Sequence, residues 1–257
     1  MPVILCLLEG VGLFDPLSGT LNNQADATVK IMKDFNRVYL EDGAYHHQAD
    51  GFRAWFLTDN YLAIKRQCVG RKRILDLGCG EGCLAGYVTD AEIDGVDYSD
   101  RALALNRELF PGRYRRLFGA DLASFGDLGL KAGSYDCIVC SLTLMYLDGR
   151  NLRHCLDETL RLLTKGGIFV VTYPTVGPHR QGSADAAEIP PAALKTALED
   201  VGYRIRTMEP SCPFLPASVV EQSKNEETRE FARAEYIAAT AQMKLENSYH
   251  FLIVGQK

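Results

Sequence analysis

A glycine-rich turn preceded by a carboxylate is the feature of this sequence best suited to chemistry. Residues 73–82 read RILDLGCGEG, a β-rich run followed by Gly-x-Gly-x-Gly and then by a helical pattern. Glycine is needed where the backbone takes positive φ, or where a ligand approaches too closely for a Cβ atom. In open α/β sheets, ligands bind beyond the carboxyl ends of the strands, where this turn would lie. A tight turn without a ligand is the alternative.

The residues around the turn argue against phosphate binding. The dinucleotide fingerprint Gly-x-Gly-x-x-Gly needs glycine at the position of Cys83, and the Gly-Lys-Ser/Thr of a P-loop is absent. An acid, Asp76, precedes the loop. Its carboxylate would repel a pyrophosphate and would favour a cationic amino group.

Two more acids end the strands that follow. Asp97 stands nineteen residues after Gly78, where a carboxylate can accept hydrogen bonds from both hydroxyls of a ribose. Asp121 ends the next predicted strand, and its side chain could accept a hydrogen bond from an adenine amino group. Three carboxylates around one glycine loop suit an uncharged ribose and base together with an amine.

Alternating strand and helix patterns would position these acids. Strands are predicted over residues 73–77, 93–97, 114–119, 136–141, 168–173, 203–208 and 249–254. Helices are predicted over 83–89, 99–110, 151–163, 190–200 and about 227–245, and around Trp55. We expect Gly166-Gly167 to end the helix that begins at 151. The alternation predicts an α/β fold with a mostly parallel sheet covered by helices on both faces.

Composition fits a soluble protein with a sizeable core. The chain has 257 residues, of which 47% are hydrophobic and 24% charged, and its net charge is −5. The acidic balance argues against nucleic-acid and anionic-membrane partners. No apolar run reaches the roughly 20 residues needed to span a bilayer, and residues 3–8 make a poor signal peptide. We therefore expect a cytoplasmic protein.

The cysteines do not predict a metal site. There are eight of them in the chain, and a single CxxC pair, Cys137 and Cys140, falls in a predicted buried strand. Residues three apart on a strand point to opposite faces, so these two thiols cannot bind one metal ion. We expect buried, reduced thiols and no metal.

Five stretches of the chain together resemble the class I S-adenosylmethionine-dependent methyltransferases, and among them the small-molecule group. They are ILDLGCGEG, GVDYSD, GADLASF, YDCIVCSLTLMYL and LLTKGGIFVVTYP, in the order and spacing typical of that family, within residues 73–175. The resemblance implies a Rossmann-like sheet of seven strands, mostly parallel with the last strand antiparallel. Helices would cover both faces, and an N-terminal helical cap would precede the sheet.

The same resemblance divides the chain into two parts. Residues 1–70 would be an N-terminal extension and helical cap, and residues 71–257 the methyltransferase domain. Residues 210–248 would be an insertion between strands six and seven. The cap and the insertion could cover the ligand crevice as a lid, or they could be simple packing.

The resemblance implies S-adenosylmethionine as cofactor and S-adenosylhomocysteine as product. The backbone of Gly78, Cys79 and Gly80 would flank the methionine part, with Asp76 near its amino group. Asp97 would hold the ribose hydroxyls. The remaining residues that the resemblance assigns to the cofactor would contact the adenine (Tyr98, Asp121 and Leu122) or line the methionine end (Ser141 and Leu142).

Markers of other methyltransferase subclasses are missing. Residues 140–143 read CSLT where adenine and glutamine N-methyltransferases carry Asn/Asp-Pro-Pro-Tyr/Phe, and no acid follows the predicted fifth strand, as a catechol-type magnesium site would need. The resemblance therefore implies methyl transfer by in-line displacement to an O, N or C atom of a small-molecule acceptor, in a biosynthetic pathway. Two alternatives stay open: a protein that binds S-adenosylmethionine for other work, such as a cyclase or a regulatory subunit, and a nicotinamide-dependent enzyme, which Cys83 disfavours.

A general base is needed only if the acceptor is protonated at working pH. Met145 stands where the small-molecule group often has histidine, so that base is not available here. The candidates for a catalytic role are His46, Tyr146 and His179, each of which could instead be structural. Phe52, Trp55 and Phe56 could form an apolar acceptor wall or could simply pack. We expect no nucleic-acid or membrane partner, and the sequence leaves a homodimer open.

Overall fold

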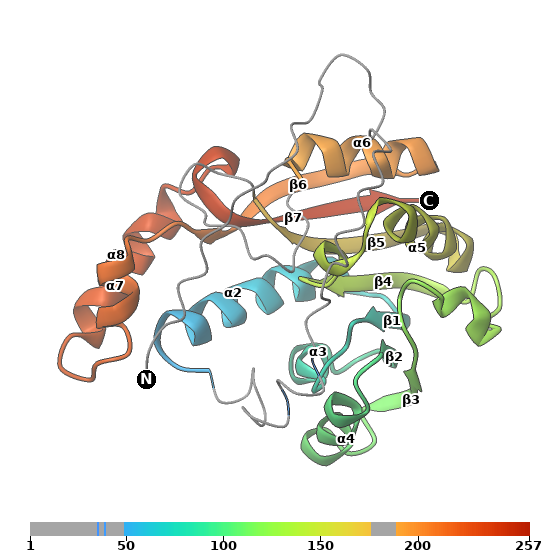
Figure 1. Ribbon diagram of the computed structural model, residues 1–257, viewed down its shortest axis with the longest axis horizontal. Coiled ribbons are helices and arrows are strands. Elements are labelled where there is room, and N and C mark those ends of the chain that lie inside the picture. The colour runs from blue at the N-terminus through green and yellow to red at the C-terminus, as the bar shows by residue number, and fades with distance from the viewer. Residues whose placement is uncertain (1–34, 36–38, 40–48, 176–188) are drawn as a thin grey trace, which may run out of the picture.

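One seven-stranded sheet forms the centre of the molecule (Figure 1). The structure, a computed structural model, describes Phe35, Tyr39, residues 49–175 and residues 189–257. Its strand order is β3-β2-β1-β4-β5-β7-β6, and β7 runs antiparallel to both of its neighbours while the other pairs are parallel. The strands are β1 (Arg73–Leu77), β2 (Glu92–Asp97), β3 (Tyr114–Gly119), β4 (Tyr135–Ser141), β5 (Leu163–Pro174), β6 (Arg204–Pro213) and β7 (Ser248–Gln256). The predicted α/β fold with an antiparallel last strand is confirmed.

Helices cover both faces of this sheet. The helices are α2 (Gly51–Cys68), α3 (Cys83–Tyr87), α4 (Asp100–Leu109), α5 (Gly149–Leu162), α6 (Pro191–Val201), α7 (Ala217–Gln222) and α8 (Arg229–Ala241). Three short 3-10 turns complete the description: η1 (Phe125–Leu128), η2 (Leu144–Tyr146) and η3 (Leu245–Asn247). One face of the sheet packs against α5 and α6, and the other packs against α2, α3 and α4.

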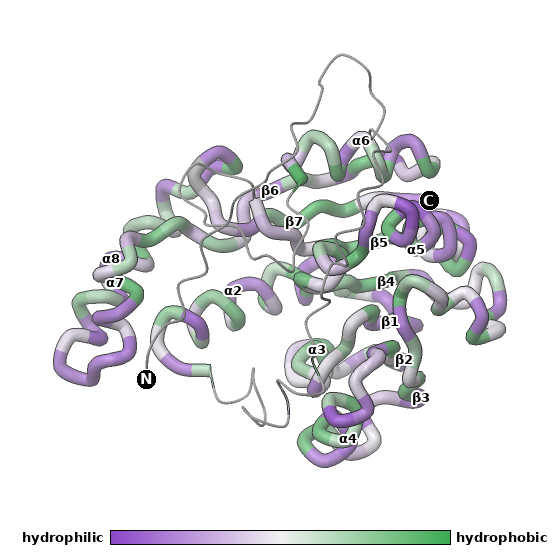
Figure 2. The backbone as a smooth tube through the Cα atoms, viewed as in Figure 1, coloured by the Kyte–Doolittle hydropathy of each residue, from purple (hydrophilic) through white to green (hydrophobic). Residues whose placement is uncertain are grey.

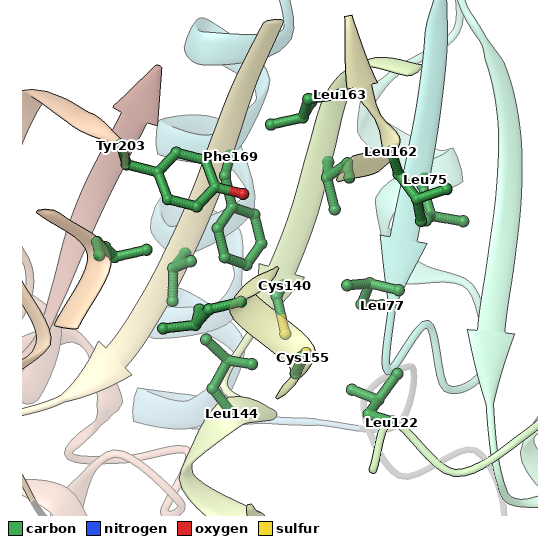
Figure 3. Close-up of a cluster of buried hydrophobic side chains, with 14 of the residues drawn as sticks. Leu75, Leu77, Leu122, Cys140, Leu144, Cys155, Leu162, Leu163, Phe169 and Tyr203 are labelled. Atoms are coloured by element: carbon green, nitrogen blue, oxygen red, sulfur yellow. The ribbon is translucent and has the colours of Figure 1, made fainter. Parts of the chain in front are cut away.

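The hydrophobic core has two parts, one on each face of the sheet, because successive side chains of the central strands point to opposite faces. Leu75 and Leu77 of β1 lie on the α5/α6 face, where Figure 3 shows them near Cys140, Cys155 and Phe169. The intervening side chains lie on the opposite face. Both faces are buried, so the central strands read as nearly continuous apolar runs, and Figure 2 shows β4 and β7 largely in the hydrophobic colour.

The cysteine pair follows the same alternation. Cys137 packs on the α2/α3/α4 face and Cys140 on the α5/α6 face, as predicted from their spacing. The Sγ atom of Cys137 lies 3.9 Å from that of Cys68, at the end of α2. The seven cysteines that the structure describes are free thiols.

Local signals explain where several helices begin and end. The side chain of Ser99 accepts a hydrogen bond from the backbone of Ala102 and so caps α4, as its position in the sequence predicts. Asp148 caps α5 in the same way through the backbone of Asn151. Gly202, at φ 116°, ends α6 in the left-handed conformation that glycine adopts without cost.

The boundary between α5 and β5 differs from the prediction. We expected Gly166-Gly167 to end the helix, but α5 ends at Leu162 and both glycines lie within β5. The cause is tertiary, because the backbones of Gly166 and Gly167 exchange hydrogen bonds with Lys257 beyond β7. Strand β6 is also longer than predicted and extends to Pro213, so the connection to β7 begins four residues later than position 210.

The connection between β6 and β7 forms a helical pair that packs on the start of α2. Tyr236 of α8 contacts the rings of Phe52 and Trp55, and its hydroxyl donates a 2.6 Å hydrogen bond to Asp59. In Figure 1 this α7–α8 pair lies at the left edge of the molecule, beside the beginning of α2. None of the helices that the structure describes is long and apolar enough to cross a membrane.

Candidate functional site

A cavity of about 230 Å³ lies at the carboxyl ends of β1, β2, β3 and β4. Helix α2 contributes to its lining. Nine of the ten residues that the sequence assigned to a cofactor line this cavity: Gly78, Cys79, Gly80, Asp97, Tyr98, Asp121, Leu122, Ser141 and Leu142. The further lining residues are Phe35, Tyr39, Arg53, Phe56, Leu57, Tyr61, Cys83, Ala120, Thr143, Met145, Tyr146 and Leu147.

The glycine loop turns directly beneath the cavity, and two of its glycines leave no room for a side chain. Gly78 has φ 69°, and a Cβ atom there would overlap the side chain of Thr143. Gly80 has φ 50°, and a Cβ atom there would lie 2.7 Å from the hydroxyl of Tyr39. The sequence pattern is therefore explained by both conformation and close approach.

The amide groups of the loop are already paired within the protein. The N–H groups of Gly78 and Cys79 donate to the carbonyl of Val96, and that of Gly82 donates to the carbonyl of Cys79. The N–H of Gly80 donates to a carboxylate oxygen of Asp97. These four hydrogen bonds hold the loop in its turn, and each of the four N–H groups has its acceptor within the protein.

Asp97 is fixed in place at the end of β2. One carboxylate oxygen accepts from Gly80 N–H at 2.9 Å and the other from Ser99 N–H at 2.9 Å. Burial raises the pKa of this carboxyl, against the lowering effect of the backbone donors. The backbone N–H of Tyr98 also interacts with this carboxylate, which keeps acceptor capacity for ligand hydroxyls without moving.

The side of the cavity near β3 combines an acid with aromatic rings. Asp121 accepts a 2.8 Å hydrogen bond from the backbone of Ala123, which orients its carboxylate. The hydroxyl of Tyr98 accepts from the backbone of Phe35 at 2.7 Å. The Phe35 ring packs edge-on against both Tyr98 and Tyr146. Flat apolar walls beside an acceptor group suit a heteroaromatic base with an amino substituent.

The end of β4 carries an unusual backbone. Leu142 has φ 52°, the one positive value among the non-glycine residues that the structure describes. Its N–H donates to the carbonyl of Thr172. The hydroxyl of the preceding residue, Ser141, accepts from Asn60 of α2 at 3.0 Å and pairs with the hydroxyl of Thr172 at 3.1 Å. Such strained conformations concentrate at functional sites, where the surrounding structure holds them.

Asp76 does not line the cavity, unlike the other nine assigned residues. It alternates onto the same face of β1 as Ile74, where its carboxyl accepts a 2.6 Å hydrogen bond from the hydroxyl of Tyr114. Desolvation by burial raises its pKa to about 7; the bond from Tyr114 lowers it and the charge of Asp97 raises it further. The carboxyl of Asp76 therefore lies outside the cavity, on the face of the sheet that packs against α2, α3 and α4.

Asp76 should make stability depend on pH. The unfolded carboxyl ionises near pH 3.8, whereas the folded one keeps its proton up to about 7. Between these values the unfolded state binds fewer protons, so the free energy of unfolding should fall as pH rises from about 4 to 7. Asp76→Asn should remove most of that decline and leave the smaller part that comes from Asp97, as measured by urea unfolding at pH 5 and pH 8. An unchanged decline in the variant would contradict the prediction.

Only one of the three catalytic candidates can be located. Tyr146 lines the cavity, next to Met145. His46 and His179 lie outside the described residues. Of the predicted aromatic wall, Phe56 lines the cavity, but Phe52 and Trp55 pack against α8 instead. Of the two alternatives that the sequence left open for these aromatic residues, packing therefore holds for Phe52 and Trp55, which α8 covers.

Sequence reasoning missed the contribution of α2. Arg53, Phe56, Leu57 and Tyr61 line the cavity from this helix, and Asn60 bonds to its floor at Ser141. The spacings of three, four and eight residues from Arg53 place the four lining residues on one face of the helix. The helix has no amphipathic pattern that singles out this face, so the sequence carries no signal that could have identified them. Among the described residues, no group of three or more metal-ligating side chains occurs.

Comparison with known proteins gives one family match. Residues 75–171 match the family model described as a methyltransferase domain. That stretch contains the glycine loop, Asp97, Asp121 and the end of β4. No curated protein matches the sequence.

Many solved structures share the fold at low sequence identity. A methyltransferase from Mesorhizobium loti, described as dependent on S-adenosylmethionine, has 21% identity and a TM-score of 0.55, over 76% of this chain and 96% of its own. The [4+2]-cyclase SpnF has 18% identity and a TM-score of 0.58, over 87% and 94%. Phosphoethanolamine N-methyltransferase 2 of Haemonchus contortus, solved with S-adenosylmethionine, has 16% identity and a TM-score of 0.59, over 86% and 60%.

Proposed function

We propose that this chain, which carries a methyltransferase domain on the class I S-adenosylmethionine-dependent methyltransferase fold, transfers the methyl group of S-adenosylmethionine to a small-molecule acceptor. The observation that carries the proposal is the anchored carboxylate of Asp97 beside the glycine loop, in a cavity at the carboxyl ends of the parallel strands. This arrangement suits a ribose, and the match over residues 75–171 supports the same family.

The residues present fit the cofactor. Asp97 would accept from the ribose hydroxyls, and Asp121 from the adenine amino group, with Tyr98 and Leu122 beside the base. The absence of Cβ atoms at Gly78 and Gly80 leaves the loop backbone open to the ligand. When bound, S-adenosylmethionine supplies an electrophilic methyl carbon for an in-line displacement.

The protein's main task in such a reaction is alignment. Positioning of the reacting atoms can lower the barrier by roughly 7–11 kcal/mol. Ser141 and the strained Leu142, held by Asn60 and Thr172, form a rigid floor for the reacting end of the cavity. Tyr146, which also lines the cavity, could orient an acceptor hydroxyl or amine.

The thiols near the cavity are kept unreactive. Burial raises the pKa of Cys83, and the nearby carboxylates of Glu81 and Asp76 raise it further. Burial likewise raises the pKa of Cys79. Both groups therefore stay protonated at neutral pH, and no thiolate competes with the acceptor for an electrophilic carbon.

The acceptor is proposed to be small and largely apolar or aromatic. Phe56, Leu57, Met145 and Tyr146 provide that surface within the cavity. The net charge of −5 supports the expectation of no nucleic-acid partner. The proposal extends to a biosynthetic role and a cytoplasmic location, which are supported by the sequence patterns alone.

A second function is favoured by one comparison. SpnF, a cyclase, shares the fold over 87% of this chain, so a site built for S-adenosylmethionine does not by itself prove methyl transfer. A protein that binds the cofactor and does other chemistry, or regulates a partner, is the alternative.

Calorimetry followed by turnover separates these functions. We expect S-adenosylmethionine and S-adenosylhomocysteine each to bind with micromolar affinity, one molecule per chain. Incubation of the methyl-labelled cofactor with a panel of phenols, amines and carboxylic acids should then yield S-adenosylhomocysteine and a labelled product. Binding without turnover across the panel would favour the second function, and absence of binding would contradict both.

A further inference from the structure

Helix α2 lies between the cavity and the α7–α8 pair and contacts both. Phe56 and Leu57 line the cavity from this helix. Phe52 and Trp55 pack instead against Tyr236 of α8, and Figure 1 shows the α7–α8 pair beside the beginning of α2. The described residues of α7 and α8 do not line the cavity. This pair can therefore reach a ligand through α2.

The first turn of α2 is capped by a residue of the α7–α8 pair. Asp50 stands at the N-cap position, but its side chain makes no capping hydrogen bond in the described structure. Instead, the Oγ atom of Ser223, at the end of α7, accepts from the backbone N–H of Phe52 at 2.8 Å. A Cβ atom on Gly51 would lie 2.5 Å from the carbonyl oxygen of Ser223, so the two segments meet too closely for a side chain at this position.

A buried polar contact joins the middle of α2 to α8. The hydroxyl of Tyr236, a residue that is 1% exposed, donates a 2.6 Å hydrogen bond to Asp59. Hydrogen bonds to a charged acceptor are roughly twice as strong as those between neutral groups. Arg233 lies over the rings of Trp55 and Tyr236, at 4.9 and 5.2 Å. Spacings of three and four residues place Phe52, Trp55 and Asp59 on one face of α2, which is the face that α8 covers.

The α7–α8 pair is also tied together internally. The hydroxyl of Thr228 donates to the carbonyl of Gln222 at 2.8 Å, and the Nε atom of Arg229 donates to the carbonyl of Ser223 at 3.2 Å. Buried apolar residues from both helices belong to one cluster. The cap at Ser223 and the hydrogen bond of Tyr236 therefore belong to one packed unit.

Two consecutive residues of α2 connect this unit to the cavity. Asp59 bonds to Tyr236 of α8, and the next residue, Asn60, donates a 3.0 Å hydrogen bond to the hydroxyl of Ser141, which lines the cavity. A ligand that fills the cavity and a docked α7–α8 pair would thus favour the same position of α2. Two events that favour the same state stabilise each other reciprocally.

We propose that the α7–α8 pair holds α2 in the position that completes the cavity, so that ligand binding and docking of this pair stabilise each other. The inference rests on the proposed function for the identity of the ligand, and it deepens that function by naming what controls one wall of the site. Tyr236 and Ser223 are positioning residues in this proposal, since they act through α2 and do not touch the ligand.

Removal of one hydroxyl tests the effect on affinity. Tyr236→Phe keeps the ring and loses the bond to Asp59, and we expect it to weaken binding of S-adenosylhomocysteine by about 3- to 10-fold. Asp59→Asn keeps an acceptor for Tyr236 and should retain most of the affinity. The matched control is Tyr203→Phe, which removes a buried 2.9 Å hydrogen bond to Thr159 on the α5/α6 face of the sheet. It should lose similar stability and change the affinity by less than about twofold.

Hydrogen exchange separates positioning of α2 from general stability. We expect S-adenosylhomocysteine to slow amide exchange in residues 229–241 of α8 as well as in α2, and Tyr236→Phe to abolish this protection in α8. Without any ligand, Tyr236→Phe should speed exchange in residues 52–60 of α2 by about fivefold or more relative to Tyr203→Phe, because local opening of the helix becomes easier.

Three results would overturn the proposal. Protection by the ligand that is confined to α2 and the sheet would show that α8 is not coupled to the cavity. An equal change of affinity in Tyr236→Phe and Tyr203→Phe would indicate a general effect on stability. If the wild type does not bind S-adenosylhomocysteine, the proposed function fails, and exchange in the free protein still decides: equal rates in residues 52–60 of the two tyrosine variants would show that α8 does not position α2.

Discussion

Asp97→Ala should weaken the binding of S-adenosylmethionine by about 100-fold or more. A hydrogen bond to a charged group contributes about 1.5–3 kcal/mol, and this carboxylate would accept two from the ribose. The substitution also leaves the N–H groups of Gly80 and Ser99 without their acceptor, which loosens the loop. Calorimetric titration of the purified variant measures the loss.

Two further variants define the cause of that loss. Asp97→Asn keeps one carbonyl oxygen as an acceptor and should retain part of the affinity. Asp157→Ala removes an exposed acid of α5 that pairs with Arg153 at 3.0 Å, and it should bind like the wild type. If Asp97→Ala bound the cofactor within threefold of the wild type, the ribose would not be held at β2.

Gly78→Ala should give the largest loss of stability among the variants considered. A left-handed backbone costs a non-glycine residue about 1–2 kcal/mol. At Gly78, φ is 69° and the added Cβ atom would also overlap the side chain of Thr143. We expect the free energy of unfolding in urea to fall by more than about 3 kcal/mol, with cofactor binding abolished.

Gly112 provides a matched control for the backbone part of this effect. Its φ is 71°, and a Cβ atom there would meet nothing within 4 Å. Gly112→Ala should therefore lose only about 1–2 kcal/mol. Adding Thr143→Gly to Gly78→Ala should restore part of the stability by removing the overlapping side chain. Equal losses for the two single variants would show that the close approach of Thr143 does not matter.

The sheet could be predicted from the sequence because its signals are local. Parallel strands buried on both faces produce short apolar runs such as residues 168–173, and the helices between them have caps such as Ser99. The acids at Asp97 and Asp121 follow their strands directly. Their meeting at one cavity required only that the carboxyl ends of parallel strands share an edge.

The boundaries that were missed depend on distant partners. The start of β5 is fixed by bonds between its two glycines and Lys257, about ninety residues away, for which residues 163–167 carry no local sign. The side-chain direction of Asp76, by contrast, could have been predicted. Strand alternation places it on the face of Ile74, away from Leu75 and Leu77.

The wall of the cavity formed by α2 was the least accessible to sequence reasoning. Asn60 meets Ser141 across 81 positions of the chain, and Arg53 lines the same cavity as Gly78 and Gly80. Nothing in the sequence states which face of this helix turns inward. The aromatic residues of this helix could equally form an apolar acceptor wall or pack inside the protein, and Phe52 and Trp55 pack against α8.

The strand order has a consequence for how this sheet assembles. In the described sheet, β6 pairs with β7 and with no other strand, while β7 alone joins β6 to β5. Strand β6 therefore cannot be incorporated until a segment that follows it by some thirty-five residues has inserted beside β5. The pairing of β7 with β5 joins residues 76 to 88 positions apart, against 63 for the pairing of β1 with β4, and contacts of greater sequence separation form more slowly. The nucleoside half of the cavity, built on β1 to β4, can thus be ordered first, and the edge formed by β6 and β7 is the last part of the sheet to become protected from solvent.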